Sequence, residues 1–414
     1  MYKTKPAGAL ALFLLTLISQ VLNPQEAAGE VFEYRYSSGA RYRILSVVDE
    51  AVFVNRVLSH RVEILIRISM EVAGVRDGKG QHRAVFQTSE RVIYSADLET
   101  QDVSAGYQWA REYESVFERD RLGYLTIDPR YFMPVVRNVP VFPGRDLQIL
   151  ESWSAEGYEI HDFRDSFGIT EPYRIPFTAN YVYLGEREWK GKMYPAFSVS
   201  YRIASRPPAV RGRLYPVRIM GEFDQIVYWS RELGQEAAYE ETFRLTFELS
   251  NGMVVEYRGT AQAGIIESEE MDRERITSEI IEEIGRLDMA DVNVRAVDEG
   301  VSISLEDIGF FADSAVMLPG ETAKLDLIAG ILARYPDRDI VVSGHTALAG
   351  TSEGRMSLSI ERARTVADYL LAKNVRSADR IVIRGFGAEL SVADNNTEEG
   401  RRRNRRVEIT ILEN

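Results

Sequence analysis

Hydrophobic and polar residues alternate with a period of two through a long part of this chain. From Val31 to about Ile265, segments such as residues 241–249 carry an apolar side chain at every second position. This alternation is typical of β-strands that bury one face. About ten strands are expected, with almost no helical periodicity between them. The pattern favours an antiparallel β-sandwich-like domain over residues 30–265.

Two dipeptides predict where neighbouring strands turn. Asn251-Gly252 lies between two alternating segments, and this pair is the strongest short signal for a tight hairpin. Asp77-Gly78 predicts a second hairpin with a longer loop. Further along, Pro140 to Gly144 followed by Trp153 predicts a rigid turn packed under an aromatic ring. The four tryptophans of the chain are expected in the core rather than as ligand platforms.

After residue 265 the apolar period changes from two to that of helices. An amphipathic helix is expected in a connector over residues 266–298, with Ile276, Ile280, Ile281 and Ile284 on one side. Two more helices are expected, one from about Gly320 and one from about Ser359. Strands are expected near residues 301–311, 339–343, 380–384 and 407–412. Strands separated by helices predict an α/β sandwich domain over residues 299–414, so the whole chain is expected to be an α+β multidomain protein.

The first 29 residues have the order of a secretory signal peptide. Lys3 and Lys5 precede an apolar stretch from Ala7 to Leu22, and small residues follow at 27–29. The stretch has 16 residues, whereas a membrane-spanning helix needs about 20. Residues 1–29 are therefore expected to be cleaved, and retention as an anchor is the alternative. No transmembrane span is expected after cleavage, and the protein is expected in the periplasm, associated with the cell wall or outer membrane.

Composition and charge exclude several classes of function. With 63 acidic and 50 basic side chains the formal charge is −13, which disfavours nucleic acid as a partner. The chain has no cysteine, so disulfides, thiolate nucleophiles and zinc-thiolate sites are excluded. Its histidines show no metal-ligand spacing. No metal, no cofactor and no catalytic residue are expected, and nothing in the sequence supports an enzymatic function.

A set of motifs in the last quarter of the chain resembles a known family. These motifs run from residue 310 to residue 408 in a consistent order. They are Phe310, Asp313-Ser314-Ala315, Gly344-His345-Thr346, Leu358-Ser359 with Arg362-Ala363, Gly385-Phe386-Gly387, Asn395, Thr397, Gly400-Arg401 and Asn404-Arg405-Arg406-Val407-Glu408. This part of the chain resembles the OmpA-like C-terminal domain family, which binds peptidoglycan non-covalently. The layout of signal peptide, β domain and this module resembles OmpA-like envelope proteins of spirochaetes.

The resemblance implies a ligand and a site. The family's ligand is a diaminopimelate end of the peptidoglycan stem, which carries an ammonium and a carboxylate together. Arg362 matches the family's arginine, and a planar guanidinium can hold a carboxylate bidentately. We expect Arg362 in the first turn of its helix, where backbone N–H groups also favour an anion. His345 and Thr346, at the carboxyl end of a strand, and Asn404 and Arg405 are expected to belong to the same ligand-binding site.

The chain departs from the family at two positions of this site. Ala347 stands where the family has the aspartate that pairs with the ammonium, and Arg355 stands where the family usually has asparagine. Losing a charged hydrogen-bond partner costs about 1.5–3 kcal/mol, and Arg355 would repel an ammonium. Glu353 and Asp313 are the acids that could replace the missing one.

Two functions therefore remain open. In the first, the protein is a non-enzymatic envelope protein whose module holds peptidoglycan weakly or in an altered way, while the β-rich domain meets other envelope proteins. In the second, the module has lost peptidoglycan binding and serves a structural or protein-interaction role. The motif with Arg362 supports the first, and Ala347 and Arg355 support the second.

Overall fold

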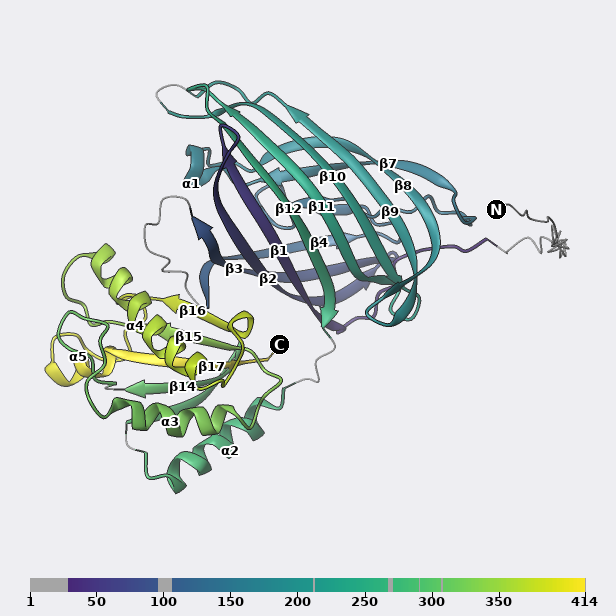
Figure 1. Ribbon diagram of the computed structural model, residues 1–414. Coiled ribbons are helices and arrows are strands. Elements are labelled where there is room, and N and C mark those ends of the chain that lie inside the picture. Colours follow the sequence, from purple (N-terminus) through teal and green to yellow (C-terminus); the bar gives the residue numbers. More distant parts are fainter. Residues whose placement is uncertain are drawn as a thin grey trace, which may run out of the picture.

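The computed structural model describes residues 29–95, 106–210, 213–266, 271–289, 291–306 and 308–413. A β-rich region comes first, and a smaller region of helices and strands lies against it (Figure 1). The expected signal peptide lies outside the described residues apart from Gly29. Among the helices that are described, none combines the length and the apolar character that crossing a membrane requires.

The β-rich region is one continuous antiparallel sheet. Ten long strands follow the order β4-β3-β2-β1-β12-β11-β10-β9-β8-β7, and the short strands β5 and β6 pair with β4 and β7. Their bounds are β1 Arg41–Val54, β2 Val57–Arg76, β3 Lys79–Ser95, β4 Tyr107–Arg119, β5 Leu125–Ile127, β6 Val136–Arg137, β7 Ser152–His161, β8 Tyr173–Trp189, β9 Lys192–Ser205, β10 Pro216–Ser230, β11 Gln235–Leu249 and β12 Val254–Ile266, with the short helix α1 Arg164–Phe167 after β7.

The antiparallel strands agree with the sequence prediction. The strand pairing does not divide them into the two separate sheets of a sandwich. The first strand, β1, pairs with β2 on one side and with the last strand, β12, on the other. This pairing joins the two ends of the region, so the sheet is unbroken from β4 to β7 and strongly curved (Figure 1). Strand β8 shows the expected alternation, with every second residue buried over most of its length.

Both predicted hairpins are present, and one is tighter than expected. Gly252 has φ +84° in the turn between β11 and β12. Asp77 and Gly78 form a two-residue loop between β2 and β3, and both have positive φ, as a tight hairpin with the twist of its strands requires. The longer loop predicted at Asp77-Gly78 was therefore wrong.

Aromatic side chains pack between the connection from β4 to β7 and strands β9 and β10. Phe142 lies 4.8 Å from Trp229 and 5.2 Å from Phe197, measured between ring centroids. Trp153 donates its indole N–H to the carbonyl of Val141 at 2.7 Å, so the predicted turn at Pro140 to Gly144 does pack under an aromatic ring. These contacts tie the connection between β4 and β7 to the inner faces of β9 and β10.

The second region has two layers, a five-stranded sheet and three helices. The sheet order is β13-β14-β17-β15-β16, and only β15 and β16 are parallel. Helices α2, α3 and α4 cover one face and share an apolar core with the strands. The bounds are α2 Arg273–Arg286, β13 Val292–Val297, β14 Gly300–Glu306, α3 Glu321–Leu332, β15 Ile340–Gly344, α4 Ser352–Ala372, η1 Ala378–Arg380, β16 Ile381–Gly385, α5 Glu398–Asn404 and β17 Arg406–Leu412.

The sequence located most of these elements and misplaced one. The helix expected from about Gly320 is α3, and it buries Leu325, Ile328, Ile331 and Leu332. Helix α4 begins at Ser352, seven residues before the predicted start at Ser359. Its true N-cap is Thr351, whose hydroxyl accepts a hydrogen bond from the N–H of Gly354 at 3.1 Å. Strand β13 and helix α5 were not predicted.

The other face of the five-stranded sheet packs against the β-rich region. Val341, Val382 and Leu412 point away from the helices and form a buried cluster with Leu65 and Tyr107. At the same place β16 pairs in parallel with β4, through Val382 and Ile383. The two regions therefore share backbone pairing and an apolar core.

A carboxylate at the edge of this interface holds two arginines. Asp339 accepts hydrogen bonds from Arg67 of the β-rich region at 2.7 Å and from Arg380 at 2.8 Å. Asp339 is 9% exposed, so it pairs with its two partners largely out of water. Removing one member of such a cluster leaves buried guanidinium groups without a counter-charge.

We predict that Asp339→Ala lowers the free energy of unfolding by about 3 kcal/mol and separates the unfolding of the two regions. Denaturant unfolding followed by tryptophan fluorescence and by circular dichroism measures both effects. Asp49→Ala is the matched control, because Asp49 pairs with Arg61 at 3.1 Å on the exposed surface and should cost less than about 1 kcal/mol. Equal losses in the two variants would contradict the role of Asp339.

Candidate functional site

Arg362 is a nearly buried cation without a carboxylate partner. It lies on α4, is 7% exposed, and donates from Nε to the carbonyl of Ser314 at 3.0 Å. Its guanidinium lies over the ring of Phe310, 5.0 Å from the ring centroid. Among the ion pairs of the described residues none involves Arg362. A buried guanidinium with free donors is a favourable receptor for a carboxylate, because the ligand would supply the missing counter-charge.

The charges around Arg362 act on its pKa in opposite directions. Burial lowers the pKa of this guanidinium, Arg405 lowers it further, and Asp313 acts to raise it. Arg405 and Asp313 are thus the charged groups that the guanidinium senses most strongly. Arg405 itself hydrogen bonds to Glu398 at 3.0 Å on the exposed side of the module. An anion at Arg362 would therefore meet a second positive charge nearby.

The prediction that Arg362 occupies the first turn of its helix was wrong, because α4 begins at Ser352. Arg362 is the eleventh helical residue, so the free N–H groups at the start of α4 lie about 15 Å away along the axis. Arg355 occupies the first turn instead and donates from Nη1 to the carbonyl of Gly350 at 2.6 Å. The helix N-terminus therefore does not reinforce anion binding at Arg362.

The end of β15 is packed tightly against α4. Gly344 has no room for a side chain, because an added Cβ would come within 1.9 Å of the carbonyl oxygen of Ser359. The N–H of Thr346 donates to the carbonyl of Gly387 at 2.7 Å, and its buried hydroxyl has no hydrogen-bond partner. Ala347 is 6% exposed and offers only a methyl group where an acid is expected from the resemblance.

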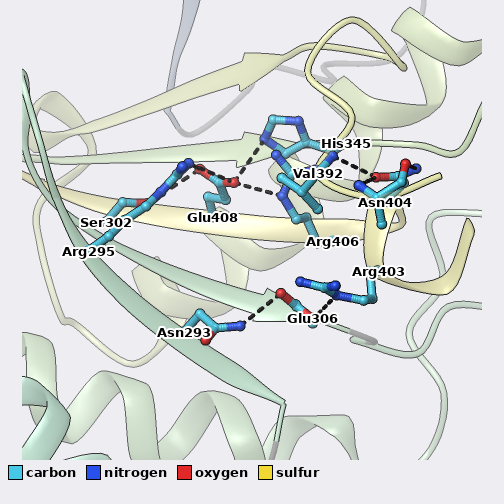
Figure 2. A network of polar contacts seen from close by, with 11 residues as sticks. Asn293, Arg295, Ser302, Glu306, His345, Val392, Arg403, Asn404, Arg406 and Glu408 are labelled. Carbon is cyan, nitrogen blue, oxygen red and sulfur yellow. Dashed lines mark hydrogen bonds and ion pairs between the residues drawn. The ribbon is translucent and has the colours of Figure 1, made fainter. Parts of the chain in front are cut away.

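His345 takes part in a polar network on the sheet face opposite the helices. On β17, Val407 and Ile409 face the helical core, so Arg406 and Glu408 face the other way. Figure 2 shows Glu408 between the guanidinium groups of Arg406 and Arg295, with His345 close to it. Glu408 accepts from Arg406 at 2.7 Å and lies 3.2 Å from Arg295 and 3.9 Å from the His345 ring.

Burial dominates the titration of this network. Burial lowers the pKa of His345 to about 3, and the charge of Arg406 lowers it in the same direction. The His345 ring stacks on Phe386 at a centroid distance of 5.0 Å. For Glu408 burial acts to raise the pKa, but Arg406 and Arg295 outweigh it and hold the pKa below its usual range. His345 is thus a neutral, 2% exposed ring packed within the protein.

Asn404 organises a loop rather than facing an open site (Figure 2). Its side-chain oxygen accepts from the N–H groups of Val392 and Ala393 at 2.8 and 3.0 Å, and its amide donates to Ala393 and Asn395. Asn395 in turn accepts from the N–H of Leu348, next to Ala347. Asn404 therefore holds the loop after β16 against the segment that carries Thr346 and Ala347.

The seven residues named from the sequence thus occupy different surroundings. Arg362 and Arg405 lie within electrostatic reach of each other, His345 and Asn404 make internal contacts, and Arg355 caps the turn before α4. Phe310 and Ser314 belong to the sequence motifs, but the sequence predicted no role for them. In the structure the ring of Phe310 and the carbonyl of Ser314 both contact the guanidinium of Arg362. Within the described residues no group of three or more metal-ligating side chains is found.

Comparison with known proteins identifies the second region. Residues 310–405 match the OmpA family. The chain therefore carries an OmpA family domain. The peptidoglycan-binding protein ArfA of Mycobacterium tuberculosis is 38% identical over 104 residues, which are 25% of this chain and 32% of that protein. Outer membrane porin F of Pseudomonas aeruginosa is 35% identical over 116 residues, 28% of this chain and 33% of that protein.

Solved structures are also similar to part of the chain. The cell wall anchor of the T6SS from Pseudomonas aeruginosa is 30% identical, and the match covers 34% of this chain and 99% of that one with a TM-score of 0.29. The chain spans about a third of the length of the curated relatives given above.

We predict that His345→Gln reduces the loss of stability on acidification. The folded protein binds fewer protons than the unfolded chain between about pH 6.5 and pH 3, because burial depresses the pKa of His345 from its unfolded value. The contribution of His345 to the free energy of unfolding is complete above about pH 6.5 and is lost as the pH falls below that value. Between pH 7 and pH 5 the wild type should lose about 2 kcal/mol more than the variant. Urea unfolding at both pH values measures this, and identical losses would contradict it.

Proposed function

We propose that this protein is a non-enzymatic component of the bacterial cell envelope whose OmpA domain associates non-covalently with the peptidoglycan stem peptide through Arg362. The observation that carries the proposal is the guanidinium of Arg362, 7% exposed and without a carboxylate partner among the described residues. Keeping such a cation buried and unpaired costs stability, and binding a carboxylate ligand offsets that cost.

The names of the relatives support a location in the cell envelope and peptidoglycan as the partner. ArfA is named a peptidoglycan-binding protein, and porin F is an outer membrane protein. The OmpA family match covers residues 310–405 and so includes Arg362. We therefore place the protein in the periplasm, associated with the cell wall or outer membrane. The β-rich region, which the OmpA family match does not cover, is proposed to meet other envelope proteins.

The ligand is proposed to be held in an altered way. Ala347 supplies no charge for the ammonium of diaminopimelate, and Arg355 adds a cation to the neighbouring turn. These two residues also favour the second candidate function, in which the OmpA domain has lost peptidoglycan and serves a structural or protein-interaction role. The two functions differ in one measurable property, the retention of the protein by purified cell-wall sacculi.

We predict that Arg362→Ala abolishes retention of the mature chain on sacculi, because a lost charge-assisted contact weakens binding about 10–150-fold. Sedimentation of sacculi followed by quantification of bound protein measures the effect. Arg364→Ala is the matched control, since it removes the same charge from the same helix about 200° around the axis. Retention of Arg362→Ala at the wild-type level would show that the ligand does not bind at Arg362.

We predict that Ala347→Asp strengthens binding of diaminopimelate about tenfold or more. The added carboxylate would supply the ammonium partner that the segment after β15 lacks. Isothermal titration of the mature chain with diaminopimelate measures the affinity. Ala349→Asp is the control, because it adds the same charge two residues further along, at an exposed position. An unchanged affinity in Ala347→Asp would mean that the missing acid does not limit binding.

A further inference from the structure

Asp313 is an exposed acid held in a rigid turn beside Arg362. The N–H of Ser314 donates to the carbonyl of Phe311 at 3.1 Å, and the N–H of Phe311 donates to the carbonyl of Val316 at 3.0 Å. Asp313 lies inside this turn with φ +48°, a left-handed conformation that aspartate and asparagine tolerate better than most residues. In the described part of the chain, no hydrogen bond or ion pair involves its carboxylate.

The same loop is fixed to α4 by two contacts, one at Arg362 and one at Thr365. The carbonyl of Ser314, next to Asp313, accepts from Nε of Arg362 at 3.0 Å. The hydroxyl of Thr365, one turn further along α4, donates to the carbonyl of Ala315 at 3.0 Å. Position 313 is therefore set relative to the guanidinium by the contacts of the two residues that follow it, and a ligand would meet both groups in a fixed geometry.

Two opposite charges that lie near each other without pairing form a receptor for a zwitterion. The carboxylate of Asp313 is close enough to Arg362 to act on its titration, yet the two make no ion pair. An amino-acid end, with its ammonium and carboxylate on one carbon, has the complementary arrangement. Its carboxylate would meet the guanidinium and its ammonium the free acid, so each charge would gain a charge-assisted contact.

We propose that Asp313 binds the ammonium group of an amino-acid ligand whose carboxylate binds Arg362, in place of the acid that is absent at position 347. This assignment rests on the proposed function of Arg362. Glu353 is the other acid named from the sequence, but it lies in the first turn of α4, nine residues before Arg362 and about 13 Å away along the helix axis. The loop contact through Ser314 favours Asp313.

The test compares two ligands that differ only in their ammonium groups. Diaminopimelate carries two carboxylates and two ammonium groups, and pimelate carries the carboxylates alone. Isothermal titration uses the mature chain and the variants Asp313→Asn, Glu353→Gln and Arg362→Ala. Asparagine keeps the left-handed turn at position 313, so the fold is retained while the charge is removed.

For Asp313→Asn we expect the affinity for diaminopimelate to fall about tenfold or more, while the affinity for pimelate stays the same or rises. Glu353→Gln should bind both ligands as the wild type does, and Arg362→Ala should lose both. If Arg362→Ala loses diaminopimelate but Asp313→Asn binds it as the wild type does, the assignment of Asp313 is overturned and the proposed function stands. If the wild type binds neither ligand and is not retained by sacculi, both are overturned.

Discussion

The arrangement of this protein depends on the face of the five-stranded sheet that has no helices. Helices α2, α3 and α4 bury one face, and the other presents Val341, Val382 and Leu412, which must be covered. The β-rich region covers it with Leu65 and Tyr107, and pairing between β4 and β16 extends one sheet into the other. Asp339 pairs with Arg67 across this contact and so links the two regions by charge as well. The OmpA domain is therefore held against the β-rich region rather than tethered to it by the chain alone.

This constraint leaves the candidate site on the helical side of the domain. Arg362 lies on α4, which packs on the sheet face opposite the β-rich region, and its contacts are with the loop after β14. The network around Glu408 lies on the other face, with Arg295 and Arg406. Arginines on both faces pair with carboxylates: Glu408 pairs with Arg295 and Arg406, and Glu283 of α2 pairs with Arg286 and Arg334. Arg362 has no such partner among the described residues, and the proposed function gives this cation an external anion.

The sequence located elements whose pattern depends on local contacts, and it failed where distant contacts decide. Helix α3 was found because its apolar residues face one core, and strands β15 and β16 were found because their apolar residues are buried on both faces of the sheet. The start of α4 was missed because its first turn, Ser-Glu-Gly-Arg, has no apolar period and is held by the cap at Thr351. The unbroken sheet was missed because pairing of β1 with β12 joins segments about 200 residues apart. At the site, motif residues gave Arg362, but only tertiary packing shows that His345 and Asn404 make internal contacts.

The packing of the two regions also has a mechanical consequence for a wall-binding site. A ligand at Arg362 pulls on α4, whose buried side chains pack on β15 and β16, and β16 pairs with β4. Force applied at the site would therefore pass through a packed core and a sheet into the β-rich region. A flexible linker would let the domain rotate freely, but the contact of Asp339 with Arg67 opposes that rotation. A bound stem peptide would thus hold the whole β-rich region at a defined orientation to the cell wall.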